Sequence, residues 1–282
     1  MIHSSIAVNT AHKWVGKCIY CGSLEALHNE HCIPESLNGV HVLEKGSCRE
    51  CARITSQFEG RFARESMLPV RTGWNMKSKR SKRKRPTEFP MRFMKGGHEE
   101  TINVPVDDHY SLIPLVELGP PGKYSLLPHA AGLRSGEYKI NPFRIRSDEH
   151  INYLIEKYGA DSISVDFQID VPGFLRMIAK IAYCTMVFRY GLNNIADVYV
   201  VPAILGKSKE IWQWVGSDGT QRHSEQTKHM NTDHLVTNWF TEDGELLSAV
   251  KIIKKSLTPE YLVVVGRLNE QTYAFYQGVR RK

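Results

Sequence analysis

Apolar side chains recur at helical spacing in three segments of the chain. Residues 149–159 (EHINYLIEKYG) and residues 171–191 (VPGFLRMIAKIAYCTMVFRYG) show this pattern, and each ends on a glycine, the residue that commonly caps a helix C-terminus. Nearer the start, Ile54, Phe58 and Phe62 lie four residues apart on one face of a further predicted helix. The pattern therefore predicts three helices, two of them in the second half of the chain.

Other segments group their apolar residues in the manner of β-strands. Residues 162–169 (SISVDFQI) alternate as a half-buried strand, and residues 234–253 predict a hairpin around a central Asp-Gly. Residues 260–268 (EYLVVVGRL) predict a further strand. Together with the two later helices, these strands predict a mixed α+β domain over residues 101–282, with a mainly antiparallel sheet.

Two turn signals precede the first helix and separate short apolar segments. Gly22 follows a pair of cysteines, and Asn38-Gly39 lies just before Val40. Asn-Gly is a common two-residue hairpin turn because both positions tolerate positive φ. The N-terminal part is therefore predicted to run as short strand, turn, short strand and helix.

Charge is distributed unevenly along the chain. The formal net charge is +7, and residues 1–100 carry all of it, with 17 Lys+Arg against 10 Asp+Glu. A run without apolar periodicity holds seven of these basic residues: Lys77, Lys79, Arg80, Lys82, Arg83, Lys84 and Arg85. We divide the chain into a module at 1–75, a basic linker or arm at 76–100 and an accessory domain at 101–282. The basic part is expected to face a polyanion.

The chain shows neither a signal peptide nor an apolar run long enough to cross a membrane. We therefore expect a cytoplasmic protein without a membrane partner.

Four of the six cysteines form two Cys-x-x-Cys pairs, Cys18 with Cys21 and Cys48 with Cys51. Without a secretion signal, such pairs are typical of metal ligands rather than of disulfides. Four thiolates on two turns can converge on one tetrahedral zinc ion, which stabilises a module too small to fold on its core alone. A closed four-cysteine site predicts a structural zinc, and the other two cysteines are expected to pack in the interior.

The sequence NEHCIPESLNG lies between the two cysteine pairs and is followed by VHVLEKGSC. The Glu-His pair, the proline, the cysteine spacing and the following helix resemble the HNH endonuclease family, more narrowly its zinc-stapled subfamily with a Glu-His first motif. The resemblance covers about residues 15–70. It implies a ββα-metal fold for the module and metal-dependent hydrolysis of phosphodiester bonds, in DNA ahead of RNA. It also implies a setting in phage defence or in a mobile element.

The resemblance assigns roles to three residues. His31 corresponds to the general base that activates a water, and Glu30 to a ligand of the catalytic Mg²⁺ or Mn²⁺. These roles agree with the chemistry of a neutral imidazole and of a hard carboxylate ligand. His41 corresponds to a residue that orients the catalytic strand, although a strand histidine with its edge in solvent is an equal alternative.

The chain departs from the family at Ala52, where the subfamily commonly has a metal-binding asparagine. One interpretation is that Glu59, two turns further on the same helix face, or water replaces the missing ligand. A second is that cleavage is weakened or lost, which leaves a zinc-held nucleic-acid-binding protein. A third is that the helix is aligned one turn off. Glu59 is also free to form a salt bridge with Arg61, Arg64 or another neighbour.

Further basic side chains on the second cysteine pair and its helix join the seven above as predicted phosphate contacts: Arg49, Arg53, Arg61 and Arg64. Such contacts bind nucleic acid without sequence specificity and are sensitive to salt. Action on RNA stays open. A single ββα module predicts nicking, and double-strand breaks would require two copies, so that a homodimer also stays open.

Overall fold

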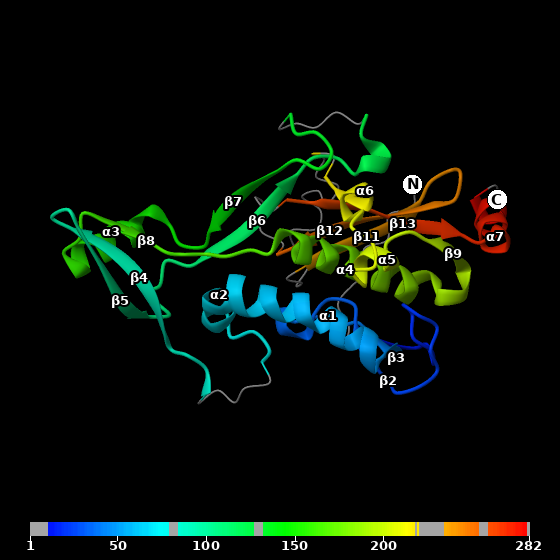
Figure 1. Ribbon diagram of the computed structural model, residues 1–282, viewed down its shortest axis with the longest axis horizontal. Coiled ribbons are helices and arrows are strands. Elements are labelled where there is room, and N and C mark those ends of the chain that lie inside the picture. The colour runs from blue at the N-terminus through cyan, green and yellow to red at the C-terminus, as the bar shows by residue number, and fades with distance from the viewer. Residues whose placement is uncertain are drawn as a thin grey trace.

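Helix α4 (Val171–Tyr190) runs through the larger part of the protein, where the N-terminal module and the C-terminal sheet pack against it (Figure 1). The computed structural model describes residues 11–78, 84–126, 132–217, 219, 234–253 and 259–280. Within these ranges α4 is the one helix long and apolar enough to cross a membrane, but 83% of its most apolar window is buried inside the protein. Asp170 caps α4 by accepting a hydrogen bond from the Gly173 amide at 3.1 Å. The helix is therefore the centre of the hydrophobic core.

The C-terminal sheet packs against α4. Its strand order is β10-β13-β12-β11, β9 also pairs with β13, and every pair is antiparallel. The strands are β9 (Ile195–Val198), β10 (Val215–Gly216), β11 (His234–Phe240), β12 (Glu245–Ile252) and β13 (Tyr261–Leu268). Gly244 takes a φ of +84° in the turn between β11 and β12, a conformation that glycine adopts without strain. The predicted hairpin and the predicted last strand are confirmed.

The N-terminal module packs on α4 through its own helix, α1. Its sheet has the order β1-β3-β2, in which β2 is antiparallel and β1 parallel to β3. The elements are β1 (His12–Trp14), β2 (Leu27–His31), β3 (Val42–Cys48), α1 (Arg49–Arg61), a π-helical turn (Phe62–Ser66) and α2 (Leu68–Gly73). The ring of Phe62 meets that of Phe174 in α4, with centroids 5.3 Å apart. The predicted order of strand, turn, strand and helix is confirmed.

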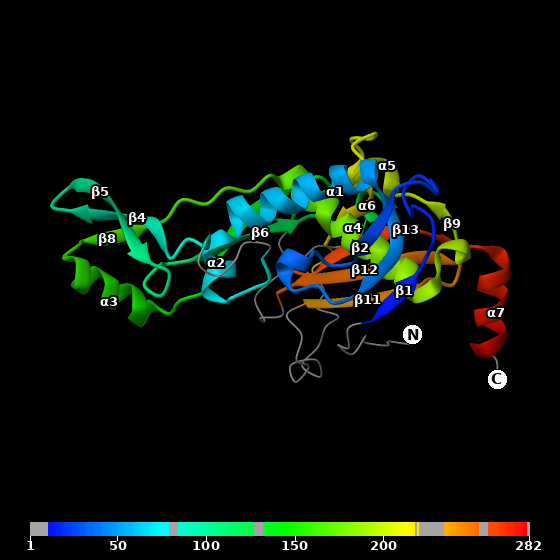
Figure 2. The same cartoon turned by 90° about the horizontal axis from the view of Figure 1, so that it is seen from below.

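A separate lobe lies at the far end of the molecule from helix α7 (Glu270–Arg280), as Figures 1 and 2 show. Its sheet has the order β5-β4-β8 with antiparallel pairs. The lobe consists of β4 (Glu88–Lys95), β5 (His98–Pro105), α3 (Asp148–Tyr158) and β8 (Ser162–Ser164). The antiparallel ribbon of β6 (Leu112–Leu118) and β7 (Tyr138–Arg144) leads from the lobe toward the C-terminal sheet.

Two expectations from the sequence are corrected by the lobe. The sequence predicts a basic linker over residues 76–100, but strand β4 begins at Glu88 within that range. Alternate side chains of β4, Phe89, Met91 and Phe93, are buried, as expected for a strand that packs on a core. The strand expected over residues 162–169 is β8, which ends after three residues. The predicted helices are confirmed as α3 and α4.

One hydrophobic core spans the module and the C-terminal sheet. It extends from Cys18 in the module through α4 to Leu268 in β13. The short helices α5 (Val201–Ile204) and α6 (Ile211–Trp214) pack against α4. The fold is mixed α+β with mainly antiparallel sheets, as predicted, but the apolar core continues across the boundary drawn at residue 75.

Candidate active site and metal centre

The four paired cysteines converge on one point in the module. Ligand atoms of Cys18, Cys21, Cys48 and Cys51 all lie within 4.8 Å of one another, and the Sγ atoms of Cys21 and Cys48 are 3.7 Å apart. Zn–S bonds of about 2.3 Å at tetrahedral angles place two sulfurs about 3.8 Å apart. The cluster therefore fits a structural zinc ion, and the predicted convergence of the four cysteines is confirmed.

Local backbone geometry brings these sulfurs together. In the first turn the Cys18 amide donates to the Ser23 carbonyl at 2.8 Å, and Gly22 has a φ of +76°. In the second pair, Cys48 is the N-cap of α1 and Cys51 lies in its first turn. Burial acts to raise the pKa of the Cys48 thiol, but the Cys51 amide and neighbouring thiols outweigh it and lower that pKa. The lowered pKa favours the thiolate at Cys48, but burial raises the pKa of Cys18 and Cys51, so the charge of a bound zinc ion would be needed to hold those two as thiolates.

His31 is the last residue of β2 and pairs with Val42 of β3. Its side chain is half-buried, and burial is the main cause of a lowered imidazole pKa. Glu35 opposes this shift and Lys180 adds to it. Nδ1 is buried and has no hydrogen-bond partner within the described ranges. The imidazole is therefore neutral near pH 7, in the form that can accept a proton.

Glu30, the neighbour of His31, is buried and meets Lys180 of α4. The Nζ atom of Lys180 lies 2.8 Å from an oxygen of Glu30 and 2.8 Å from an oxygen of Glu59. It also donates a hydrogen bond to the His31 carbonyl. Lys180 is 0% exposed. Glu30, Glu59 and Lys180 are called the Lys180 cluster below. The two carboxylates that the sequence assigns to one ion do lie together, and a lysine lies between them.

The Lys180 cluster places two carboxylates and one ammonium in the protein interior. Burial acts to lower the pKa of Lys180, but attraction to Glu30 and Glu59 outweighs burial and raises that pKa well above its ordinary value. Burial raises the pKa of Glu59, with Lys180 opposing and Glu30 adding to the shift. Lys180 is therefore charged at neutral pH, and its charge offsets the cost of the buried Glu30 carboxylate and of the Glu59 carboxylate, whose side chain is 17% exposed.

This arrangement does not fit a divalent ion held by Glu30 and Glu59. Mg²⁺ needs oxygen ligands at about 2.0–2.1 Å, and the Lys180 ammonium lies in the space between the two carboxylates. An ammonium and a divalent cation repel each other and do not share such a position. Ala52, in the first turn of α1, contributes no ligand atom.

Glu59 forms the salt bridge that the sequence leaves open, but its partner comes from α4. The two neighbouring arginines on its own helix do not take this role. Arg61 pairs with Asp170 at 2.7 Å, and more distantly with Glu65 at 3.9 Å. Helix α4 is thereby joined to α1 at two points, through Asp170 at its N-terminal end and through Lys180 near its middle.

His41 directly precedes β3 and contacts α4 through its ring. Its carbonyl accepts a hydrogen bond from the Cys32 amide at 2.9 Å, so that its backbone bonds the chain next to His31. The ring packs edge-on against Phe188, with centroids 4.9 Å apart, and burial lowers the imidazole pKa. Nε2 is buried without a hydrogen-bond partner in the described part of the chain. The ring of His41 therefore belongs to the packing between the module and α4.

The basic residues predicted to contact phosphates differ in their surroundings. Six are exposed: Arg49, Arg53, Arg61, Arg64, Lys77 and Lys84. Arg53 pairs with Glu50 at 2.7 Å, which partly neutralises it as Asp170 does Arg61. Arg85 is half-buried and donates to the Asn75 side chain at 2.9 Å. The other four predicted contacts lie outside the described residues: Lys79, Arg80, Lys82 and Arg83.

Lys77 lies in electrostatic range of His31, because its charge helps to lower the pKa of the imidazole. Its backbone is held at both ends of the residue. The Lys77 amide donates to the Asn38 side chain at 2.9 Å, and its carbonyl accepts from the Arg71 guanidinium at 2.9 Å. The buried Arg71 also donates to the Ser36 carbonyl at 2.7 Å. The start of the basic segment is thus fixed against the loop that follows β2.

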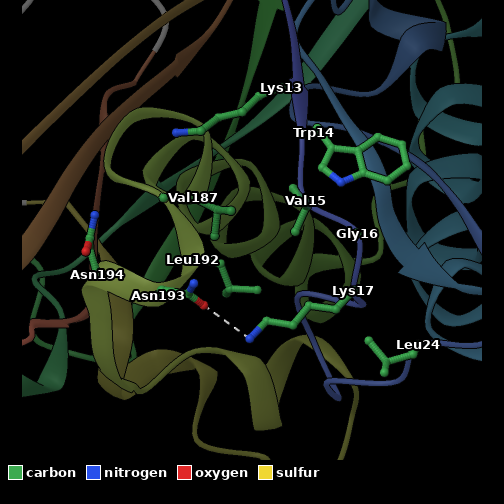
Figure 3. Close-up of a pocket in the computed structure, with 11 residues that line it drawn as sticks. Lys13, Trp14, Val15, Gly16, Lys17, Leu24, Val187, Leu192, Asn193 and Asn194 are labelled. Atoms are coloured by element: carbon green, nitrogen blue, oxygen red, sulfur yellow. Dashed lines mark hydrogen bonds between the residues drawn. The ribbon is translucent and has the colours of Figure 1, made fainter.

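A cavity of about 480 Å³ lies between β1 and the C-terminal end of α4 (Figure 3). Lys17 donates to the Asn193 side chain at 3.2 Å, and Lys13 to the Phe188 carbonyl at 2.7 Å. Trp14 is 68% exposed. An exposed indole between two lysines is a combination that stacks on bases and attracts phosphates. These residues are absent from the sites predicted above, and the string HKWVGK was the available signal.

Lys180 is also absent from the predicted site residues, although the sequence carries a signal for it. It is a charged residue in the middle of a helix whose other central residues are apolar. A lysine at such a position is seldom fully buried unless it is paired, so an acidic partner on another element is the expected reason for its presence.

Comparisons with protein-family models, with curated proteins and with solved structures find no match for this chain. The cysteine cluster, His31 with its neighbours and the basic surface beside them are the features that bear on function.

Proposed function

We propose that the protein hydrolyses phosphodiester bonds in nucleic acid, DNA ahead of RNA, with His31 as the general base. The observation that carries this proposal is the position of His31. It is a neutral, half-buried histidine at the end of β2, in a strand, strand and helix unit whose last strand and helix meet at the four-cysteine cluster. The same order of elements belongs to the HNH family that the sequence resembles.

In the proposed reaction His31 takes a proton from a water, and the water oxygen forms a bond to phosphorus. The bond between phosphorus and the 3′ oxygen breaks, and the leaving oxygen takes a proton from solvent. Lys77 is exposed and its backbone is held against the loop that follows His31, so it is the candidate to contact the phosphate that is attacked. No step passes through a divalent ion, because Glu30 and Glu59 are engaged by Lys180.

A zinc ion in the cysteine cluster would have a structural part in this function. It would join the turn before β2 to the junction of β3 and α1, and so hold the strand that ends at His31. Its binding energy would stabilise the module. All six cysteines are free, in agreement with the reducing cytoplasmic location that we propose.

A plasmid-nicking assay tests the proposal. His31→Ala should convert supercoiled plasmid to open circles at least about 100-fold more slowly than wild type, because a general base contributes a factor of that order. Binding of the same DNA in a gel-retardation assay should not change. The matched control is His28→Ala, which removes an exposed histidine from the same strand and should cut at the wild-type rate. Cutting by His31→Ala at that rate would overturn the proposal.

Nucleic-acid binding without cleavage is a second candidate function, and two observations favour it. Ala52 offers no ligand at a position where the family has one, and Lys180 engages both candidate metal-binding carboxylates. Retardation of DNA and of labelled single-stranded RNA, without cleavage of either in any metal, would support this function instead.

A further inference from the structure

We propose that the ammonium of Lys180 takes the place of the divalent ion, so that cleavage by His31 requires no metal at Glu30 and Glu59. The inference rests on the proposed function and deepens it, because it concerns how the same site is assembled. Lys180 is fully buried and touches no substrate. It is therefore a positioning residue, which acts through the groups that it holds.

The geometry of the Lys180 cluster matches what a bound ion would provide. Lys180 joins three groups from two elements of the module: the Glu30 carboxylate and the His31 carbonyl in β2, and the Glu59 carboxylate in α1. An ion bound by a strand carboxylate and a helix carboxylate would make the same connection between β2 and α1. The ammonium makes it through a hydrogen bond to the His31 carbonyl and through ion-pair contacts of 2.8 Å with Glu30 and Glu59, of which the Glu59 oxygen accepts no hydrogen bond in the described part of the chain.

Uncharged side chains surround the Lys180 cluster. Its near neighbours Tyr20, Cys32 and Cys184 are buried, and the Tyr20 hydroxyl lies 3.3 Å from the Cys184 sulfur. A phenol and two thiols are neutral at pH 7 at their ordinary pKa values, and burial raises the pKa of Cys184 further. Removing the Lys180 side chain would therefore leave two carboxylates facing a space of cation size, walled by neutral groups.

The ammonium of Lys180 is a permanent part of the site, because its side chain is covalently attached to α4. A metal ion exchanges with solvent, whereas Lys180 is carried by α4, the most buried helix of the fold. Its local concentration beside Glu30 and Glu59 is fixed by folding. A free divalent ion must displace a charged group that is already paired, so ordinary concentrations of Mg²⁺ or Mn²⁺ should leave the site unchanged.

Nicking by wild-type protein in metal-depleted buffer is the first test, with the zinc content of the same sample measured so that loss of the structural ion is not mistaken for an effect at Glu30. We expect a rate that added Mg²⁺ or Mn²⁺ does not change. A rate that depends on either ion, and is abolished by His31→Ala, would overturn the inference and leave the proposed function standing. Absence of nicking in every buffer would overturn the proposed function.

Binding of Mn²⁺, measured by electron paramagnetic resonance, tests the inference independently of nicking activity. Wild type should bind none at this site, Lys180→Ala should bind one ion, and Lys180→Ala with Glu59→Gln should lose it again. In the nicking assay, Lys180→Ala should be inactive without metal and recover with Mn²⁺ or Mg²⁺, a rescue that a packing defect would not show.

Two results would count against the inference here. One is Mn²⁺ binding to wild type that Glu59→Gln abolishes, and the other is a folded Lys180→Ala protein that binds no Mn²⁺. If Lys180→Ala does not fold, the wild-type rate and the wild-type Mn²⁺ titration still decide. Lys209→Ala, which removes an exposed lysine from another part of the chain, is the matched control and should equal wild type in both assays.

Discussion

In the part of the chain that the structure describes, a three-stranded sheet that contacts a helix occurs both in the N-terminal module and in the lobe. In the module the sheet β1-β3-β2 goes with α1, and in the lobe the sheet β5-β4-β8 goes with α3. The module contributes its apolar side chains to the core around α4. The lobe has a small core of its own, which includes Met91, Phe93 and Leu154.

Charged groups follow the same division. Lys180, which α4 places between two carboxylates of the module, is 0% exposed, whereas in the lobe the Lys157 side chain is 40% exposed where it pairs with Asp108. Surface pairs contribute little to stability, and a buried charge is costly if its partner is removed. The module, whose carboxylates are neutralised by a lysine of α4, thus depends on α4 for its stability, whereas the lobe, which has its own core, does not.

Loss of zinc ligation should separate the two units most strongly. Cys48→Ser is expected to lose zinc and to unfold the module, because the binding free energy of a structural zinc, on the order of 10 kcal/mol, is also folding free energy. Hydrogen exchange read by mass spectrometry should show loss of protection in β3 and α1 and retained protection in β5 and α3. Cys32→Ser, outside the cluster, should keep one zinc per chain. Full protection of α1 in a zinc-free Cys48→Ser protein would contradict this expectation.

Removal of the buried ammonium should have the next largest effect. Lys180→Met leaves the buried Glu30 and the partly buried Glu59 without their cation, which is expected to lower the free energy of unfolding by about 3–5 kcal/mol. The matched change in the lobe, Lys157→Met, removes an ammonium at the surface and should have a far smaller effect. Urea unfolding of the two variants measures the difference. Equal losses of unfolding free energy would show that the buried ammonium contributes no more to stability than the exposed one.

Basic residues near His31 should matter more for nucleic-acid binding than those of the lobe. Lys77→Ala is expected to weaken DNA binding and to reduce the slope of log Kd against log salt by about 1, because one phosphate contact is lost. Lys95→Ala, in β4 of the lobe, should leave the slope unchanged. Fluorescence anisotropy over a salt series measures Kd and its salt dependence for both variants. An unaltered slope for Lys77→Ala would show that Lys77 does not contact a phosphate.

The surface pair of the lobe should give the smallest effect, and it should depend on pH. Burial acts to raise the pKa of Asp108, but hydrogen bonds from Lys157 and Tyr158 outweigh it and lower that pKa below its ordinary value. A lowered carboxyl pKa contributes stability above the unfolded value, about 3.9, and this stability is lost as the pH falls through the folded value. The expected contribution is below about 1 kcal/mol.

Hydrogen exchange in α3, corrected for intrinsic rates, would follow this loss of stability during acidification. Asp108→Asn should flatten the dependence, because the variant side chain does not titrate. An identical acid profile for wild type and variant would assign the effect to another group.

Features with a local cause were predictable from the sequence. The Cys-x-x-Cys spacing requires only two turns, and the helices α3 and α4 end at glycines that take φ values of +59° and +90°. The hairpin of β11 and β12 needed only its Asp-Gly turn. In each case the residues that determine the feature lie within a few positions of one another.

Features that depend on distant contacts were not predicted. Strand β4 lies next to the basic run and was assigned to an arm, although Phe89, Met91 and Phe93 alternate there; the partners that complete the strand, in β5 and β8, are separate in sequence. The same holds for Lys180, because no local pattern joins it to Glu30. The carboxylates were identified, but the group that lies between them comes from another part of the chain.

The distance of 149 residues between His31 and Lys180 along the chain also has a consequence in time. A ribosome that adds about 5–20 residues per second needs roughly 7–30 s to pass from one to the other. During that interval the nascent module acquires His31, Glu30 and Glu59 but does not yet have the Lys180 ammonium. Translation therefore completes this site only after α4 has been made, and a chain that stalls before residue 180 carries the parts of the site without its assembly.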